Sequence, residues 1–245
     1  MHKERIGQTE FSFELVESKQ ELEELYRLRY QVYCNECNFL REEDYPESKE
    51  SDKYDPYSLH FVARDSHGPI GTARLIMDNP NGFPIETHYR GNLDFDIKSA
   101  NRKQVAEISR LTISKAYRRR KDDELYYSKD YVDPGAQPET GGLKRIKPMA
   151  FGLYREIYQE CKRRNIAVWV AMMEKTLWLL LRMHNFAFRP IGEEIDVYGP
   201  IRPYVCEIGD VEKNVYQKSS DNLYKYFLDG LEPEHHPKLP EKQLT

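Results

Sequence analysis

Charged side chains lie inside segments that otherwise have the pattern of buried strands, and this feature restricts the fold most. Arg74 ends the run Gly-Thr-Ala-Arg within an apolar strand pattern, and Glu107 and Arg110 interrupt a second strand at 105–113. A charge in a core-like strand is costly unless it is paired or takes part in function. Charges of both signs at these positions therefore predict a polar site built on a sheet.

Further polar and aromatic residues precede these strands. Arg29 and Tyr33 are four residues apart, so they share one face of a helix, and Phe39 follows them. Asp52 and Asp55 lie in a polar, aromatic loop. Simple packing is an alternative for the two aromatic residues. A solvated acidic loop is the alternative for the aspartates, because other acidic residues lie close by: Glu42, Glu43, Asp44, Glu47 and Glu50.

In this order the set resembles the LuxI-type acyl-homoserine-lactone (autoinducer) synthases. That family has an Arg-x3-Phe-x5-Trp helix, an Asp-x2-Asp loop, a strand Arg and a Glu-x2-Arg pair on a later strand. Here the helix reads Arg29-x3-Tyr33-x5-Phe39, with both aromatic residues substituted. The resemblance covers about residues 10–205. It extends to acyltransferases associated with PEP-CTERM/exosortase systems and to N-acyl amino acid synthases.

The pattern of elements is mixed α/β. Periodicity predicts strands at 11–16, 59–64, 70–77, 105–113, 166–173 and 204–208, helices at 18–37, 144–164 and 176–184, and a hairpin through 186–189 and 195–198. The resemblance implies a GNAT-like N-acyltransferase fold. Such a fold has a mixed, mostly antiparallel central sheet, flanking helices and a V-shaped splay, here between the strands at 105–113 and 166–173.

One acyltransferase domain is expected at 1–210, followed by a C-terminal extension at 211–245. The extension holds one amphipathic stretch at 223–231 and ends in a Pro-rich, charged segment that is expected to be disordered. Residues 78–103 are expected to be irregular, and residues 116–139 form a highly charged, aromatic excursion.

Acyl transfer from a thioester to an amine needs a neutral amine, aligned reactants and donors for the developing oxyanion. Glu107 is the candidate general base, because a carboxylate partly buried in a strand has a raised pKa and can take a proton from an ammonium. An internal ion pair of Glu107 with Arg110 or Arg74 is the alternative, and the two roles are compatible. Arg110 and Arg74 complete the catalytic set.

The remaining candidates are expected to bind substrate. Arg110 and Arg74 are expected to pair with Asp52, Asp55 and Glu107, and Arg29 with the two aspartates. Tyr33 and Phe39 line the acceptor pocket in this interpretation. Trp169 and Met172 belong to a mostly apolar core segment, and the resemblance places the acyl-chain pocket beside it.

The donor is an acyl thioester of acyl carrier protein or coenzyme A, and no permanently bound cofactor is expected. The residues after Arg110 contain no glycine-rich loop for a pyrophosphate, which favours acyl carrier protein. A basic run is either a solvated surface or a contact for that acidic partner; it consists of Arg118, Arg119, Arg120 and Lys121.

Composition excludes several other classes. The net charge of −4 argues against a general nucleic-acid binder, and no apolar run is long enough to span a bilayer. With no signal-peptide pattern, the protein is expected to be cytoplasmic. Cys34 and Cys37 have the spacing of half a zinc site, but two reduced cysteines are the favoured interpretation, and no metal is expected.

Three functions stay open at this point. The acceptor amine is that of an amino acid or, in an autoinducer synthase, of S-adenosylmethionine. A third reading from another class is a non-catalytic module that binds an acyl lipid or acyl carrier protein.

Overall fold

The computed structural model describes residues 2–6, 9–118, 143–197, 199–218 and 221–239. The chain forms two compact units. The first contains Met1–Ser51, His60–Ala73 and Arg110–Tyr154, and the second contains Asp52–Leu59, Arg74–Ser109 and Arg155–Thr245. Four elements run from one unit into the other: β3 (Ser58–Asp65), β4 (Gly68–Ile76), β5 (Val105–Ile113) and α4 (Leu143–Arg163).

In the first unit the strands follow the order β1-β2-β3-β4-β5. The strand β1 (His2–Ile6), which the sequence did not predict, pairs antiparallel with β2 (Thr9–Leu15), and β2 pairs antiparallel with β3. The predicted strand at 11–16 and the predicted hairpin at 59–77 are confirmed to within a few residues. Phe13 of β2 is completely buried and anchors this part of the core.

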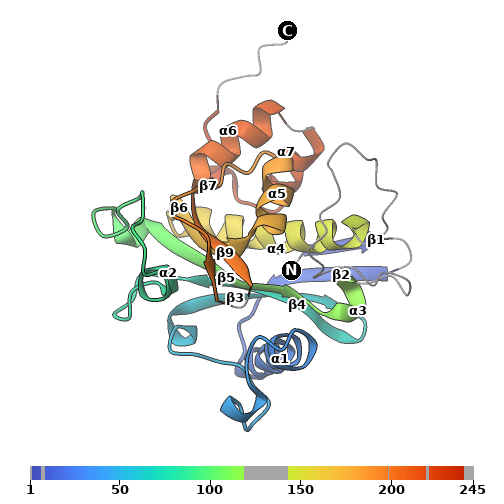
Figure 1. Ribbon diagram of the computed structural model, residues 1–245. Coiled ribbons are helices and arrows are strands. Elements are labelled where there is room, and N and C mark those ends of the chain that lie inside the picture. The colour runs from blue at the N-terminus through green and yellow to red at the C-terminus, as the bar shows by residue number, and fades with distance from the viewer. Residues whose placement is uncertain (1, 7–8, 119–142, 198, 219–220, 240–245) are drawn as a thin grey trace. The chain divides into compact units, whose positions relative to one another are not determined.

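Ser18 is the N-cap of the helix α1 (Lys19–Tyr30), as predicted. The Ser18 side chain accepts a hydrogen bond from the Glu21 N–H, and the Glu21 carboxylate accepts one from the Ser18 N–H. Leu25 and Leu28 are buried. A π-helical turn at Gln31–Glu36 extends the helix, with a Cys37 N–H bond to the Val32 carbonyl. Figure 1 shows α1 on one side of the strands of this unit and the start of α4 on the other.

In the second unit the strand order is β4-β5-β6-β9-β7, with β8 also paired to β9. The strand β6 (Val168–Glu174) runs parallel to β5 and antiparallel to β9 (Pro200–Glu207). The sheet is therefore mixed and mostly antiparallel, as predicted. A cluster around Val105, Val170 and Val205 forms the core on one face of these strands. The short helix α2 (Pro84–His88), which the sequence missed, packs beside β6.

The predicted hairpin at 186–198 is wrong. The strands β7 (Arg189–Pro190) and β8 (Ile195–Asp196) each pair with β9 and not with each other. The segment between them is held instead by the loop before β5. The Tyr89 hydroxyl accepts the Glu193 N–H at 2.7 Å, and the Ile191 carbonyl accepts the Asp94 N–H at 2.7 Å.

The last helices of the second unit are α5 (Lys175–Met183), α6 (Ile208–Lys218) and α7 (Asp221–Leu228). The sequence predicted α5 and part of α7 but missed α6. The tail is tied to α4, since Arg155 Nε donates to the Tyr226 carbonyl at 2.8 Å and the Phe227 ring contacts the Tyr158 ring. Shorter helical turns are α3 (Lys115–Arg118), Glu42–Asp44, Asp55–Tyr57, Arg102–Gln104 and Pro233–His235.

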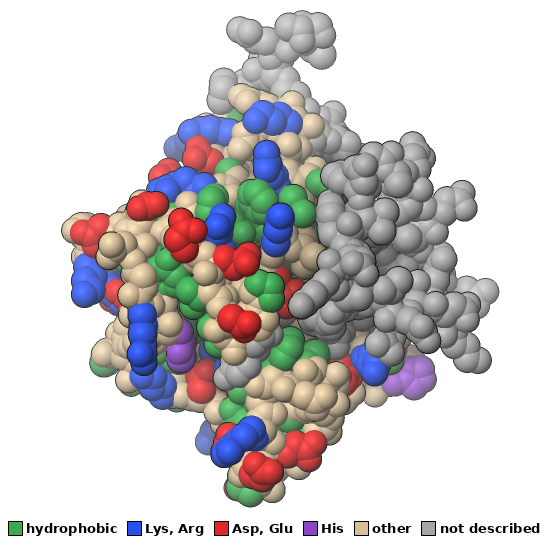
Figure 2. Space-filling view, viewed as in Figure 1, with side chains coloured by type: hydrophobic (Ala, Val, Ile, Leu, Met, Phe, Trp, Pro, Cys, Tyr) green, Lys and Arg blue, Asp and Glu red, His purple; other side chains and the backbone are tan. Residues whose placement is uncertain are grey.

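None of the helices within the described ranges has the length and apolar character of a bilayer span. On the face shown in Figure 2, the described basic and acidic side chains are interspersed rather than gathered by sign.

Close packing between α4 and β2 depends on Gly152. A Cβ atom at this position would lie 2.3 Å from the Phe13 ring. We expect Gly152→Ala to destabilise the fold by about 1–3 kcal/mol, because the ring or the helix must shift. A lower melting temperature than that of the unaltered protein would show this.

Gly209 provides the matched control, because it also lies in a helix but a Cβ there would meet nothing within 4 Å. Gly209→Ala should leave the melting temperature unchanged or raise it, since alanine favours the helical backbone. Equal melting temperatures for the two variants would contradict the packing argument.

Candidate functional site

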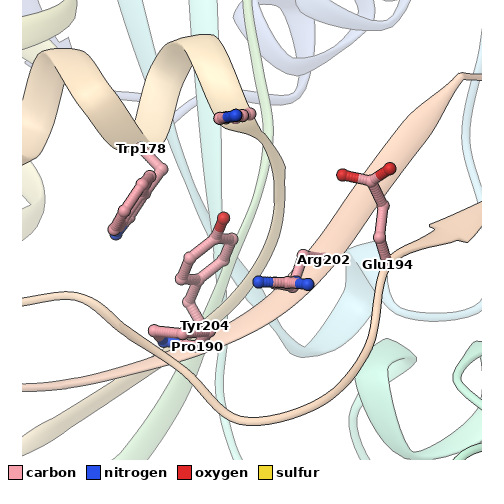
Figure 3. Close-up of a pocket in the computed structure, with 6 residues that line it drawn as sticks. Trp178, Pro190, Glu194, Arg202 and Tyr204 are labelled. Carbon is pink, nitrogen blue, oxygen red and sulfur yellow. The ribbon is translucent and has the colours of Figure 1, made fainter.

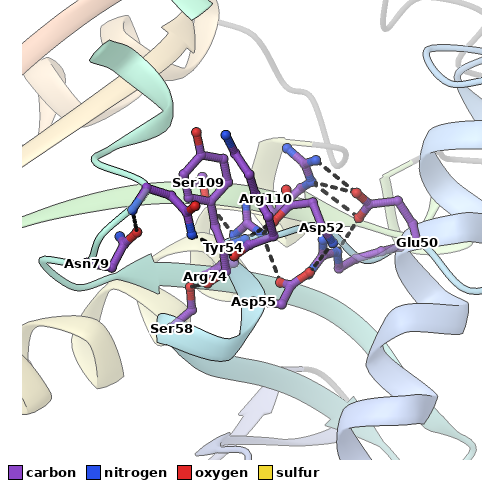
Figure 4. Close-up of polar contacts among 12 residues, drawn as sticks. Glu50, Asp52, Tyr54, Asp55, Ser58, Arg74, Asn79, Ser109 and Arg110 are labelled. Carbon is purple, nitrogen blue, oxygen red and sulfur yellow. Dashed lines mark hydrogen bonds and ion pairs between the residues drawn. The ribbon is translucent and has the colours of Figure 1, made fainter. Parts of the chain in front are cut away.

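In the first unit a buried carboxylate lies between two arginines. Glu50 is completely buried and forms ion pairs with Arg29 and Arg110. Arg29 Nε donates to Glu50 Oε2, and Arg110 Nη2 donates to Glu50 Oε1 at 2.8 Å. We call Arg29, Glu50 and Arg110 the Glu50 cluster; Glu50 and Arg110 are labelled in Figure 4. Arg29 is itself completely buried, whereas 28% of the Arg110 side chain is exposed.

Local backbone structure positions each member of this cluster. Arg29 lies in the last turn of α1. The Glu50 N–H donates to the Tyr26 carbonyl of the same helix at 3.0 Å, which holds the loop against α1. Arg110 lies within β5 and has a φ of +51°, a left-handed conformation that is uncommon for a residue other than glycine. Its side chain therefore departs from the regular alternation of the strand.

The two arginines determine the charge state of Glu50. Burial alone would raise the pKa of this carboxyl group. The charges of Arg29 and Arg110, together with their hydrogen bonds, outweigh burial and lower the pKa to about 2. Glu50 is therefore an anion throughout the physiological pH range.

Tyr33 and Phe39 lie beside this cluster. The Phe39 N–H donates to the Tyr33 carbonyl at 2.8 Å, and the two ring centroids are 6.4 Å apart. The Arg110 guanidinium lies over the Tyr33 ring at 5.4 Å. Tyr33 belongs to the π-helical turn, a geometry that often occurs at functional sites. Four predicted site residues thus belong to one unit: Arg29, Tyr33, Phe39 and Arg110.

In the second unit Arg74 is the centre of another buried polar group. Its Nη1 donates to Asp52 Oδ1 at 2.7 Å and to Asp55 Oδ1 at 2.8 Å, and its Nε donates to Ser109 Oγ at 3.0 Å. We call these four residues the Arg74 cluster (Figure 4). The Arg74 and Asp55 side chains are almost completely buried, and Asp52 is one-quarter exposed. The predicted pairing of Arg74 with both aspartates is confirmed.

The Asp-x2-Asp spacing has a local structural reason. Asp52 Oδ1 accepts the Tyr54 N–H at 2.8 Å, and Asp55 Oδ2 accepts the Asp52 N–H at 2.6 Å. Each aspartate therefore uses one hydrogen bond to hold the turn and another to hold Arg74. The loop is fixed by the same carboxylates that pair with the arginine.

Glu107 lies in the second unit and is buried. Its Oε2 accepts the Ile85 N–H at 2.9 Å, so it satisfies a backbone donor in the first turn of α2. Residues of β5 two apart share a face, which places Glu107 with Val105 and Ser109. In the parallel pairing of β5 with β6, Glu107 lies opposite Val170. Met172 lies two residues after Val170 and so is on the same face of the sheet.

Trp169 lies on the opposite face of β6. It is completely buried, its Nε1 donates to Cys161 Sγ at 3.1 Å, and its ring stacks on Phe188. The structure thus places Met172, but not Trp169, on the face that carries Glu107. A role for either residue in binding an acyl chain stays a prediction.

The parallel pairing of β5 and β6 runs from Val105 and Val168 to Ile108 and Ala171. In contrast, β6 continues to pair with β9 up to Glu174. The ladder between β5 and β6 therefore ends one residue after Glu107, within the pair of strands for which the sequence predicts the splay.

Sequence reasoning missed Glu50 and Ser109. Glu50 was treated as one of many acidic loop residues, because no local spacing distinguishes it from them. Ser109 lies two residues after Glu107, and strand alternation alone places it on the same face.

Arg119, Arg120 and Lys121 lie outside the described residues, and so does the side chain of Arg118, so contact with acyl carrier protein stays a prediction. Neither Cys34 nor Cys37 belongs to a disulfide among the described residues. Within the described ranges, no group of three or more His, Cys, Asp or Glu side chains is arranged to hold a metal ion.

Residues 28–128 match the family model of the acetyltransferase (GNAT) domain. This stretch contains both arginine clusters and Glu107. Among curated proteins, none matches the sequence.

Solved structures share the fold over most of the chain. The AHL synthase LasI is 12% identical, with a TM-score of 0.58 over 85% of this chain and 95% of that chain. The CoA-dependent acyl-homoserine lactone synthase BjaI, solved with SAM and isopentyl-CoA, is 16% identical, with a TM-score of 0.56 over 86% and 82%. FeeM, an N-acyl amino acid synthase from uncultured soil microbes, is 10% identical, with a TM-score of 0.57 over 84% and 95%.

At these identities the structural likeness establishes the fold, which is the predicted GNAT-like one. Together with the domain match, it supports an acyltransferase of GNAT type.

We expect the Glu50 cluster to stabilise the fold less as the pH falls. Because the folded-state pKa of Glu50 is depressed to about 2 from 4.5, its stabilising effect is complete above pH 4.5 and is lost as the pH falls toward 2. A difference of this size corresponds to about 3 kcal/mol. Glu50→Gln should lose a similar free energy of unfolding at pH 7, and the deficit relative to the unaltered protein should shrink between pH 4.5 and 2. Urea denaturation across this pH range measures both effects.

Glu47→Gln is the control, because Glu47 lies in the same loop but is exposed. It should follow the unaltered protein at every pH. If Glu50→Gln also does so, Glu50 does not hold the two arginines in the way described.

Proposed function

We propose that this chain is an N-acyltransferase that moves a fatty acyl group from a thioester of acyl carrier protein, or of coenzyme A, to the amine of a small acceptor such as an amino acid. The GNAT domain match and the shared fold support acyl transfer. The observation that carries the proposal is the position of Glu107, a buried carboxylate one residue before the end of the β5–β6 ladder.

In the proposed reaction the amine nitrogen attacks the thioester carbonyl. A C–N bond forms, the C–S bond breaks, and the thiol leaves with a proton. Glu107 takes the proton that the acceptor ammonium must lose, directly or through one water molecule. Backbone N–H groups of β6 beyond Ala171 receive the thioester oxygen and the amide groups of the pantetheine arm.

The arginine clusters hold the surroundings of this reaction in place. Arg74 fixes the Asp52–Asp55 turn and, through Ser109, the end of the paired part of β5. A guanidinium is suited to this task because its rigid fork can serve several acceptors at once. In this proposal Arg74 and Arg110 position the site, and the Tyr33–Phe39 pair lines the acceptor pocket.

The alternative acceptor is S-adenosylmethionine, which would make the chain an autoinducer synthase. BjaI, which shares the fold, was solved with SAM. Four residues of this chain that correspond to the autoinducer-synthase motifs belong to one unit: Arg29, Tyr33, Phe39 and Arg110. The substituted aromatic residues favour a different amine. A cytoplasmic location and an association with PEP-CTERM/exosortase systems remain predictions, which fractionation and gene neighbourhood would test.

Glu107→Gln should abolish most turnover while the fold survives, because an amide oxygen can still accept the Ile85 N–H but cannot take up the proton. A loss of about 100-fold or more is expected for removal of a general base. The chain is expressed in a bacterium beside the variant, and N-acyl amino acids and acyl-homoserine lactones are measured by mass spectrometry.

Glu207→Gln is the matched control, because Glu207 is an exposed carboxylate on β9. Products that depend on the unaltered protein identify the acceptor. Full turnover by Glu107→Gln would contradict the base assignment. A purified protein that carries a fatty acyl species without any product would instead favour the binding-module function.

Loss of the basic run at 118–121 should weaken the use of acyl carrier protein as donor but not the use of acyl-CoA. Replacing all four residues with glutamine should raise KM for acyl carrier protein by about tenfold, from about 0.3 kcal/mol for each exposed charge pair. The KM for acyl-CoA should change little. Steady-state kinetics at low and high salt distinguish the donors, because screening removes the difference. An equal effect on both donors would contradict docking of the carrier protein at this run.

A further inference from the structure

The short helix α2 lies on the face of the second unit that carries Glu107. Ile85, in its first turn, is completely buried and packs in the same core cluster as Val170, which lies opposite Glu107 on β6. The stacked rings of Trp178 and Tyr204 (Figure 3) belong to the other face of the sheet. The Glu107 carboxylate therefore meets α2, and its Oε2 accepts the Ile85 N–H at 2.9 Å.

A second contact ties α2 to the residues before β5. Arg102 begins the helical turn that directly precedes this strand, and Glu107 lies near the start of the strand itself. The Nη1 and Nη2 atoms of Arg102 donate to the two oxygens of Glu86 at 2.9 and 3.1 Å, and its Nε donates to Asp78 at 2.8 Å. Because Glu86 follows Ile85 in α2, neighbouring residues of the helix are held by side chains from one short segment of chain.

The Arg102–Glu86 pair is a bidentate clamp. Two parallel bonds between a planar guanidinium and a carboxylate fix geometry as well as charge. The exposed fraction is 14% for the Glu86 side chain and 26% for the Arg102 side chain. Glu86 Oε2 also accepts the Phe83 N–H at 2.8 Å, and the Arg102 guanidinium lies over the Phe83 ring at 4.8 Å. Burial would raise the pKa of Glu86, but these hydrogen bonds outweigh it and lower the pKa, so Glu86 is ionised.

The Arg74 cluster reaches the same helix through Tyr54. The Tyr54 N–H donates to Asp52 of that cluster, and the Tyr54 side chain is buried in the core. The Tyr54 hydroxyl lies 2.9 Å from Thr87 Oγ1, which itself donates to the Pro84 carbonyl at 3.1 Å. Because the Thr87 hydroxyl has one hydrogen and uses it in this way, Tyr54 is the donor of the pair. Tyr54 thus holds α2 at a point separate from the Arg102 clamp.

We propose that Arg102 and Tyr54 are positioning residues for Glu107. They hold α2, and α2 in turn holds the Glu107 carboxylate through the Ile85 N–H. This inference rests on the proposed role of Glu107 as the general base. A base must lie within hydrogen-bond reach of the proton that it takes, and a misplacement of about 1 Å can cost about 100-fold in rate. A bond from a backbone N–H also favours the ionised form of a carboxylate, which is the form that accepts a proton.

The first test needs no turnover. The full chain is labelled with ¹⁵N-isoleucine, and the Ile85 amide signal is identified by its absence from the NMR spectrum of Ile85→Val. Glu107→Gln should shift the proton of this signal upfield, because an amide oxygen is a weaker acceptor than a carboxylate. Arg102→Met should shift it in the same direction, since α2 loses its clamp, and Arg102→Lys should shift it less. Lys103→Met is the matched control, because Lys103 is exposed in the same helical turn, and it should leave the signal in place.

The second test is the rate of acyl transfer per folded chain. Arg102→Met should lower kcat by about tenfold, because the base is less well aligned, while KM for donor and acceptor stays unchanged. Arg102→Lys keeps a charge for Glu86 and should restore part of the loss. Lys103→Met should match the unaltered chain.

An Ile85 signal that stays in place in folded Arg102→Met, or that moves equally in Lys103→Met, would overturn the proposal. If Arg102→Met does not fold, Tyr54→Phe decides, because it keeps the buried ring and removes only the hydroxyl. An unmoved Ile85 signal in that variant would overturn the proposal as well. An unaltered chain that makes no acylated product would contradict the proposed function, whereas the Ile85 signal would still show whether Arg102 positions the carboxylate.

Discussion

The enclosure of the Glu50 carboxylate between two guanidinium groups is the interaction on which the polar centre of the first unit depends. A buried ion that loses one partner becomes an uncompensated charge in a medium of low dielectric constant. The three partners come from α1, from the loop before Asp52 and from β5, so the ion pairs join segments that are distant in the sequence. Arg110, of which about a quarter is exposed, also places its guanidinium over the Tyr33 ring and so joins the cluster to the aromatic pair.

A single short stretch of chain supplies carboxylates to arginines in both units. Glu50 serves Arg29 and Arg110 in the first unit, and two residues later Asp52 begins the turn that serves Arg74 in the second unit. Asp52 and Asp55 each pair with Arg74 and also accept a backbone N–H of the turn, whereas the Glu50 carboxylate pairs with two guanidinium groups. This double use explains how charged residues can persist in strands that otherwise form a core.

The sequence predicts what depends on local spacing. The Arg29–Tyr33 helix face, the Asp52–Asp55 turn and the strand positions of Arg74 and Glu107 follow from periodicity and short motifs. Glu50 could not be separated from its acidic neighbours in this way, because its burial depends on Arg110, sixty residues away. The separate pairing of β7 and of β8 with β9 escaped prediction for the same reason. The Tyr89 side chain, which holds the loop between β7 and β8, lies about a hundred residues earlier in the sequence.

Strand alternation divides the chemistry of the second unit between two faces. Glu107, Val170 and Val205 share one face, on which a carboxylate is buried among aliphatic side chains and caps α2. Tyr204 and Arg202 project from the other face, where the Tyr204 ring stacks on Trp178. Because a strand residue cannot change face without a shift of register, the two environments cannot merge while β9 keeps its pairing with β6.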